Sequence, residues 1–157
     1  ADIVVMVQGD EPMVQPAMVT AVVEAMRAEP AVTCVNLAAP IADAAEFDDP
    51  NTIKVVMSAG GDALYFSRQP VPHHGFGSGL AWRQVCVIGF RRPALRQFAA
   101  LPPGRLEQLE SIDMLRFLEH GIGVRIVPTA AGTQAVDTPA DLQRVDRLLQ
   151  QREAARG

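Results

Sequence analysis

The stretch DIVVMVQGDEP, residues 2–12, decides how the fold of this chain is interpreted. Its apolar part, residues 3–7, is an unbroken run of aliphatic side chains and methionine. Such a run is typical of a strand covered on both faces, as the strands of parallel sheets are. The run ends in Gly9, Asp10 and Glu11, and α/β proteins bind ligands beyond the carboxyl ends of their strands. The stretch therefore predicts a buried strand with a candidate site at its end.

A strand–helix–strand unit is predicted to follow from this opening. Pro16 suits the first position of a helix, and apolar residues recur at helical spacing from Met18 to Met26. Pro30 ends this helix, and the apolar run 32–38 is the next predicted strand. This order of elements is the repeating unit of α/β sheets.

The rest of the chain continues the alternation. Two β-type runs on either side of Gly60-Gly61 predict a hairpin over residues 51–68, because glycine tolerates a positive φ. Further elements are expected as a strand at 83–91, a helix at 106–120, a strand at 123–129 and a helix from Thr138 onward. The pattern predicts an α/β fold with a mostly parallel sheet and an antiparallel hairpin insertion.

The composition is typical of a globular protein that binds neither nucleic acid nor a membrane. The chain has 157 residues, a net charge of −4 and 48% hydrophobic residues, which fits one globular domain over residues 1–157. No apolar run approaches the ~20 residues of a membrane helix, and an acidic chain lacks the basic surface that nucleic acid attracts. We therefore expect neither a nucleic-acid nor a membrane partner, and a cytoplasmic protein whose Cys34 and Cys86 are reduced.

The first residues suggest that the domain is incomplete. The chain opens at Ala1 and enters its most apolar strand at once. A strand covered on both faces needs neighbouring strands and helices, and a domain rarely begins with it. We expect this sequence to be the later part of a longer protein.

Asp10 and Asp137 form a candidate metal site. Asp10 ends the first strand, and Asp137 follows the loop after the strand at 123–129. If the two loops meet, their carboxylates can hold Mg²⁺ beside the phosphates of a nucleotide. In the alternative interpretation, Asp10 binds its own loop and Asp137 stabilises a helix start.

Five segments together resemble a known family. They are VMVQGDEPMV (5–14), NTIKVV (51–56), ALYFSR (63–68), LEQLESIDMLR (106–116) and AVDTPADL (135–142). In this order they resemble the 3-deoxy-manno-octulosonate cytidylyltransferases, also called CMP-Kdo synthetases. The resemblance extends over nearly the whole chain and is weaker at 70–84, and its first and last motifs are the specific ones.

The resemblance implies a three-layer, Rossmann-like nucleotidyltransferase fold and a reaction. CTP and a 3-deoxy-2-ulosonic acid such as Kdo would give the CMP-sugar and pyrophosphate, for lipopolysaccharide or capsule biosynthesis. It further implies a homodimer and a Mg²⁺ cofactor held by Asp10 and Asp137. By the same resemblance Gln8 would face the sugar, and Arg68 would pair with the carboxylate of the acid, for which a guanidinium has a matching fork of donors. For Arg68 the alternative is a salt-bridged hairpin residue.

The sequence departs from the family in two respects. The N-terminal nucleotide-binding loop of the family, with its Gly, Arg and Lys residues, is not found in these 157 residues, so we expect the chain alone to be incomplete for activity. At positions expected to face the sugar, Gln84 replaces a histidine and Ile88 a tyrosine, while Asp113 replaces a glutamate and Met114 a glutamine. Gln84 and Asp113 remain candidate substrate-binding residues, and the changes suggest an altered acceptor.

Other interpretations stay open from the sequence. The chain could be a non-catalytic or fragmentary binding or assembly module of the same fold, or a nucleotidyltransferase for another acid acceptor. Several charged or polar residues are interpreted as solvent-exposed rather than functional: Lys54, His73, His74, Glu107 and Glu110. For Lys54 a contact with phosphate or a structural contact is the alternative.

Overall fold

The structure is a computed structural model, and it describes residues 1–9, 11–130, 136 and 139–154. The elements in chain order are β1 (Ile3–Val7), α1 (Pro16–Ala28), β2 (Cys34–Pro40), α2 (Ala44–Asp48), β3 (Lys54–Met57), β4 (Ala63–Ser67), β5 (Trp82–Arg91), α3 (Arg92–Ala100), α4 (Arg105–Glu110), α5 (Leu115–Glu119), β6 (Arg125–Pro128) and α6 (Pro139–Ala154). The α/β class and the predicted hairpin are confirmed, with Gly61 at a φ of 84° in the turn.

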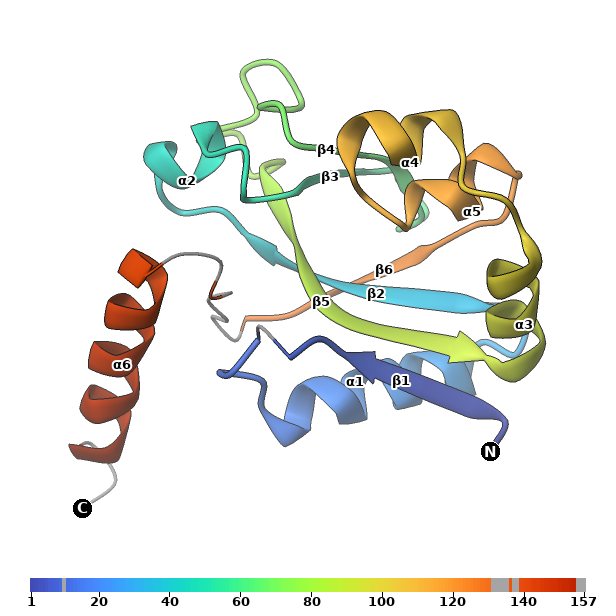
Figure 1. Cartoon of the computed structure of the whole chain (residues 1–157), viewed down its shortest axis with the longest axis horizontal. Helices are drawn as coiled ribbons and strands as arrows, with labels where there is room; N and C mark the ends of the chain where they lie inside the picture. Colours follow the sequence, from blue (N-terminus) through green and yellow to red (C-terminus); the bar gives the residue numbers. More distant parts are fainter. Residues whose placement is uncertain (10, 131–135, 137–138, 155–157) are drawn as a thin grey trace.

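The six strands form one mixed sheet. Its order is β4-β3-β5-β2-β6, and β1 pairs with β5. Within the described residues only β2 and β6 pair in parallel, while β5 is antiparallel to β1, β2 and β3. The expectation of a mostly parallel sheet is therefore wrong. β1 and β2 do run in the same direction, as a strand–helix–strand unit requires, but β5 lies between them (Figure 1).

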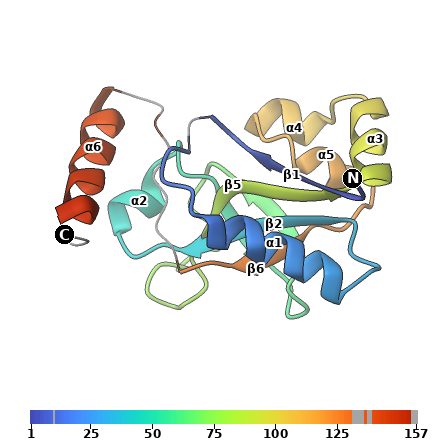
Figure 2. The same ribbon diagram turned by 90° about the horizontal axis from the view of Figure 1, so that it is seen from below.

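Helices cover both faces of the sheet and give three layers. α1 packs on one face against β1, β2 and β5, and α3, α4 and α5 lie on the other (Figure 2). Two buried clusters correspond to these layers, one around Met18, Val22 and Met26 of α1 and one around Phe66 and Phe117. α6 stands to one side of this body (Figure 1).

Gly89 of β5 lets α1 lie close to the sheet. A Cβ atom at this position would come within 2.3 Å of Val22 Cγ1 and 2.8 Å of Met26 Sδ. Only a residue without a side chain fits there. The absence of a β-carbon thus sets the packing distance between α1 and the central strand.

Two sequence expectations about individual elements are wrong. β1 is only half-buried, and Val7 is 45% exposed, because β5 is its one strand neighbour among the described residues. The helix expected over 106–120 is divided into α4 and α5, because Ser111 adopts a left-handed φ of 54°. Leu109, in α4 before the break, is 82% exposed.

No helix in the described part of the chain is both long enough and apolar enough to cross a membrane. Cys34 and Cys86 are not joined in a disulfide, and Cys34 is the buried one of the two.

Candidate active site

A cavity of about 640 Å³ lies beyond the carboxyl end of β1. Its walls come from the start of β5, the turn before β3, the end of the hairpin and the connection between α4 and α5. All four predicted substrate-binding residues, Gln8, Arg68, Gln84 and Asp113, line it. They come from four separate parts of the sequence, and the structure brings them together.

Asp10 and Asp137, the predicted magnesium ligands, lie outside the described residues. Their neighbours in sequence do line the cavity, since Gln8 and Glu11 flank Asp10 and Asp141 follows Asp137 by four residues. Within the described ranges, no three His, Cys, Asp or Glu side chains converge in a way that could hold a metal ion. The metal assignment therefore stays a prediction.

The lining of the cavity is strongly acidic. Among the described residues, two arginines line it, Arg68 and Arg83. The carboxylates are more numerous: Glu11, Glu46, Asp49, Glu107, Asp113 and Asp141. An anionic ligand is repelled by such a surface unless cations accompany it.

Glu11 is a buried acid rather than a loop surface residue. Its side chain is 5% exposed, and Cys86 donates its backbone N–H to Glu11 Oε1 at 3.3 Å. The backbone N–H of Glu11 donates to the carbonyl of Gln8 at 3.2 Å, which turns the chain at the end of β1. Glu11 thereby fastens the strand-end loop to β5, beside the cavity.

Arg68 is held by backbone carbonyls. Its Nε donates to Glu110 O at 2.7 Å, Nη1 to Pro50 O at 2.9 Å and Nη2 to Ser111 O at 3.4 Å. Three of its N–H groups therefore join the hairpin to two other walls of the cavity. This gives Arg68 a structural role, and its predicted contact with the carboxylate of a ligand stays a prediction.

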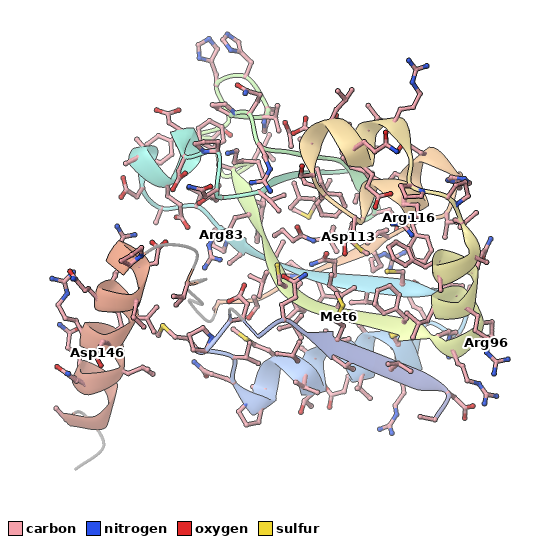
Figure 3. The ribbon with its side chains drawn as sticks, in the orientation of Figure 1. Met6, Arg83, Arg96, Asp113, Arg116 and Asp146 are labelled. Atoms are coloured by element: carbon pink, nitrogen blue, oxygen red, sulfur yellow. The ribbon has the colours of Figure 1, made fainter. Side chains whose placement is uncertain are left out.

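Arg83 is a second cation of the cavity, and the sequence interpretation missed it. Its Nε lies 2.9 Å from Glu46 Oε1. Burial raises the pKa of Glu46, and the positive charge of Arg83 opposes that rise. No sequence signal identified Arg83, because an arginine near the start of a strand is common on protein surfaces. Both Arg83 and Asp113 are labelled in Figure 3.

Lys54 is wholly buried, so the expectation of a solvent-exposed strand residue is wrong. Its Nζ donates to Asp49 O at 2.8 Å, Thr52 O at 2.7 Å and Arg68 O at 2.6 Å. Burial is the main cause that lowers its pKa. The three carbonyls use the donors of an ammonium group, which makes Lys54 a structural residue of the cavity wall.

Glu107 and Glu110 are also engaged, contrary to the expectation of a solvent-exposed face. Glu107 accepts hydrogen bonds from Nε of Arg116 at 2.8 Å and from its Nη2, and this pairing is the main cause that lowers the pKa of Glu107. Glu110 accepts from Tyr65 Oη at 3.2 Å and Ser67 Oγ at 3.1 Å. Together they hold α4 against the rest of the molecule.

Asp113 lies in the connection between α4 and α5, half-buried at the cavity. Burial is the main cause that raises the pKa of its carboxyl group, and the charge of Glu107 adds to the effect. Hydrogen bonds from the backbone N–H groups of Met114 and of Asp113 itself lower this pKa. A carboxylate in this setting is a strong acceptor for a hydroxyl group, since water solvates it poorly.

The four departures from the family divide into two kinds. Gln84 and Asp113 line the cavity, and their predicted contact with the sugar stays a prediction. Ile88 and Met114 are fully buried in the hydrophobic cluster under α5 and are not among the cavity residues. The expectation that all four positions face the sugar is therefore wrong for Ile88 and Met114, where an apolar side chain suits its surroundings.

Known proteins with a similar sequence are cytidylyltransferases. A family model described as cytidylyltransferase matches residues 1–126. The chain is 45% identical over 150 residues to the 3-deoxy-manno-octulosonate cytidylyltransferase of Anaeromyxobacter sp. (strain Fw109-5), a match that covers 94% of this chain and 60% of that protein. It is 43% identical over 154 residues to the protein of the same name from Syntrophobacter fumaroxidans, covering 96% and 62%.

A solved structure gives the same result for the fold. CMP:2-keto-3-deoxy-manno-octonic acid synthetase, complexed with CTP, superposes with a TM-score of 0.86 at 40% identity, over 97% of this chain and 63% of that one. The chain thus spans about three-fifths of the length of the relatives it matches. Because the family model matches most of its residues, the chain belongs to the cytidylyltransferase family.

Proposed function

We propose that the protein built on this chain transfers CMP from CTP to a 3-deoxy-2-ulosonic acid, Kdo or a close relative. The oxygen of the anomeric hydroxyl attacks the α-phosphorus, the bond to the β-phosphate oxygen breaks, and pyrophosphate leaves while the hydroxyl proton goes to solvent or a carboxylate. The convergence of Gln8, Arg68, Gln84 and Asp113 on one cavity carries this proposal. It is supported by relatives named as cytidylyltransferases for 3-deoxy-manno-octulosonate.

The acidic lining supports a requirement for divalent cations. A nucleoside triphosphate and a sugar acid are both anions, and acidic residues outnumber basic ones among the described residues that line the cavity, even though Glu107 is paired with Arg116 and Glu46 with Arg83. Positive charge has to be added before both ligands can enter. We propose Mg²⁺ as its source, with Asp10 and Asp137 as ligands, because carboxylate oxygens are the ligands that this ion prefers.

When bound, Mg²⁺ would neutralise the phosphates and the charge that develops on the leaving pyrophosphate. The residues of the chain have other tasks. Gln8, Arg83 and Asp113 line the cavity. We propose that the amide of Gln8 and the carboxylate of Asp113 bind hydroxyl groups of the sugar, and that Arg83 supplies positive charge to its acid group. Lys54 and Arg68 keep the walls at a fixed distance through backbone carbonyls.

We further propose that the protein works in the cytoplasm, where CTP is held, as a homodimer in lipopolysaccharide or capsule biosynthesis. Sedimentation velocity of the purified protein tests the oligomeric state. A single species at the monomer mass over a wide range of concentration would contradict the dimer.

Pyrophosphate release tests the activity. The 157-residue chain, with any sequence encoded in frame with it, is incubated with CTP, Mg²⁺ and a panel of sugar acids that includes Kdo, and products are followed by ³¹P NMR. We expect pyrophosphate and a phosphodiester signal with Kdo or another 3-deoxy-2-ulosonic acid. Binding of CTP with no pyrophosphate from any acid would contradict the proposed activity and favour a non-catalytic module. Pyrophosphate release only with a different class of acid would contradict the proposed identity of the acceptor.

A further inference from the structure

Asn36 and Gln84 form a buried polar pair under the cavity. Asn36 on β2 is fully buried, and its Nδ2 donates to Leu37 O at 2.8 Å and Val85 O at 2.9 Å. The pairing of β2 with β5 shifts register between Asn36 and Leu37, which brings these carbonyls to the amide. Gln84 on β5 is 8% exposed and donates from Nε2 to Asn36 Oδ1 at 2.6 Å.

The two backbone carbonyls determine the orientation of both amides. A carbonyl oxygen only accepts hydrogen bonds, so the Asn36 atom that faces Leu37 O and Val85 O has to be the NH₂ group. The other atom, Oδ1, then faces Gln84 and only accepts. The Gln84 atom in contact with it is consequently the donor, Nε2, and Oε1 lies on the side away from Asn36.

We infer that Asn36 is a positioning residue that turns the Gln84 amide so that its Oε1 faces the cavity and accepts a hydrogen bond from a hydroxyl group of the acceptor acid. The inference rests on the proposed function for the identity of the ligand. The amide of a flexible glutamine can present either its oxygen or its NH₂ group to a ligand. The NH₂ group of Gln84 is bound by Asn36, and Asn36 is itself fixed by hydrogen bonds to two backbone carbonyls.

The fixed orientation has a consequence for how the acid lies in the cavity. A carboxylate or phosphate has no proton to give to Gln84 Oε1, and the two oxygens would repel each other. The hydroxyl-bearing part of the acid is therefore placed over Gln84. Its acid group has to lie toward positive charge, which the guanidinium groups of the same cavity provide.

A double-mutant cycle tests the pair. Gln84→Met keeps the length of the side chain and removes its polar atoms, and Asn36→Leu does the same at its neighbour. With the full-length protein we expect each single variant to raise the KM for Kdo about three- to tenfold, the effect of one hydrogen bond between neutral groups, with the KM for CTP unchanged. In the Gln84→Met background, Asn36→Leu should raise the KM for Kdo no further.

Val35→Ala is the matched control. Val35 is fully buried on the same strand but belongs to the cluster under α1, on the opposite face of the sheet. We expect it to lower stability without changing the KM for Kdo. If Asn36→Leu does not fold, Asn36→Ser takes its place, because a hydroxyl that both donates and accepts no longer dictates the orientation of Gln84.

Two kinetic results would overturn the inference. In the first, the Asn36 variant raises the KM for Kdo equally with and without the Gln84 amide. In the second, it leaves the KM for Kdo unchanged in both backgrounds. A readout without ligand keeps these results apart from a failure of the proposed function. In ¹⁵N-resolved NMR spectra, the Gln84 NH₂ protons should exchange slowly in the wild type and rapidly in the Asn36 variant, whether or not Kdo is a substrate. Rapid exchange in the wild type would also contradict the pair.

Discussion

Lys54 Nζ lies 2.6 Å from the carbonyl oxygen of Arg68, so a buried ammonium group on β3 closes the end of the β3–β4 hairpin. The same nitrogen reaches Asp49 O and Thr52 O in the turn before β3. Arg68 joins the same two segments in the opposite direction, since its Nη1 donates to Pro50 O in the turn before β3 at 2.9 Å. Two cations thus use backbone carbonyls, rather than carboxylates, to frame one side of the cavity.

We expect Lys54→Met to destabilise the protein by about 2–4 kcal/mol. The substitution keeps the buried chain length but leaves three carbonyl groups without their donor, and each buried polar group that loses its partner carries a desolvation cost. Urea unfolding followed by circular dichroism measures the change. Arg96→Met, at an exposed side chain of α3 (Figure 3), is the surface control, with an expected change below ~0.5 kcal/mol. Equal stability of the two variants would contradict the structural role of Lys54.

Gly89→Ala should destabilise the protein by about 1–3 kcal/mol, because the new methyl group overlaps Val22 and Met26 of α1. A second substitution, Val22→Ala, opens space for it, so the double variant should be more stable than the sum of the two single effects predicts. Gly123→Ala is the matched control, since a Cβ atom there meets nothing within 4 Å. Strict additivity of the two changes would show that the contact with Val22 is not the cause.

Asp113→Asn should change how stability depends on pH. Burial raises the pKa of Asp113 in the folded protein above its ordinary value of 3.8, which the unfolded chain retains. The folded state therefore holds this proton more tightly, and the contribution of Asp113 to stability falls as pH rises from about the unfolded value through the folded pKa. The asparagine variant lacks this loss, so thermal unfolding should show a gain in stability over the wild type at neutral pH and none at a pH below the unfolded value.

The same variant should bind the acceptor acid more weakly if Asp113 accepts a hydrogen bond from a hydroxyl group, because a charged acceptor is stronger than an amide oxygen. We expect a KM for Kdo raised about tenfold or more. A gain in stability with an unchanged KM would limit Asp113 to a structural role. The thermal measurements at the two pH values and the kinetic measurement are therefore made on one preparation.

Asp10→Asn and Asp137→Asn should each abolish Mg²⁺-dependent pyrophosphate release while leaving the fold intact. An amide oxygen is a weaker ligand for a divalent cation than a carboxylate, and we expect a loss in rate on the order of 100-fold. Circular dichroism checks the fold, and Asp48→Asn, an exposed position on α2, is the control. Wild-type rates and Mg²⁺ dependence in either variant would assign that carboxylate a structural role.

Much of the fold follows from local sequence patterns. Apolar runs predicted β1, β2, β5 and β6, and paired glycines predicted the hairpin, because burial of side chains and the allowed φ of glycine act over a few residues. The motif residues Gln8, Arg68, Gln84 and Asp113 were identified on the sequence and do line one cavity. Each of these features depends on residues that are near one another in the chain or on a family motif.

The pairing of the strands and the burial of charged residues were decided by the tertiary structure. The sequence of an apolar strand has the same pattern whether its neighbour runs parallel or antiparallel to it. The position of β5 between β1 and β2 could therefore not be predicted from the sequence. Lys54 resembles an exposed strand residue until the turn before β3 and the end of the hairpin supply carbonyl groups to it. The Asn36–Gln84 pair arises in the same way, since 48 residues separate its members and only the alignment of β2 beside β5 brings their amides into contact. Hydrogen bonds act over about 3 Å, so partners that are distant in the chain are determined only when the sheet is assembled.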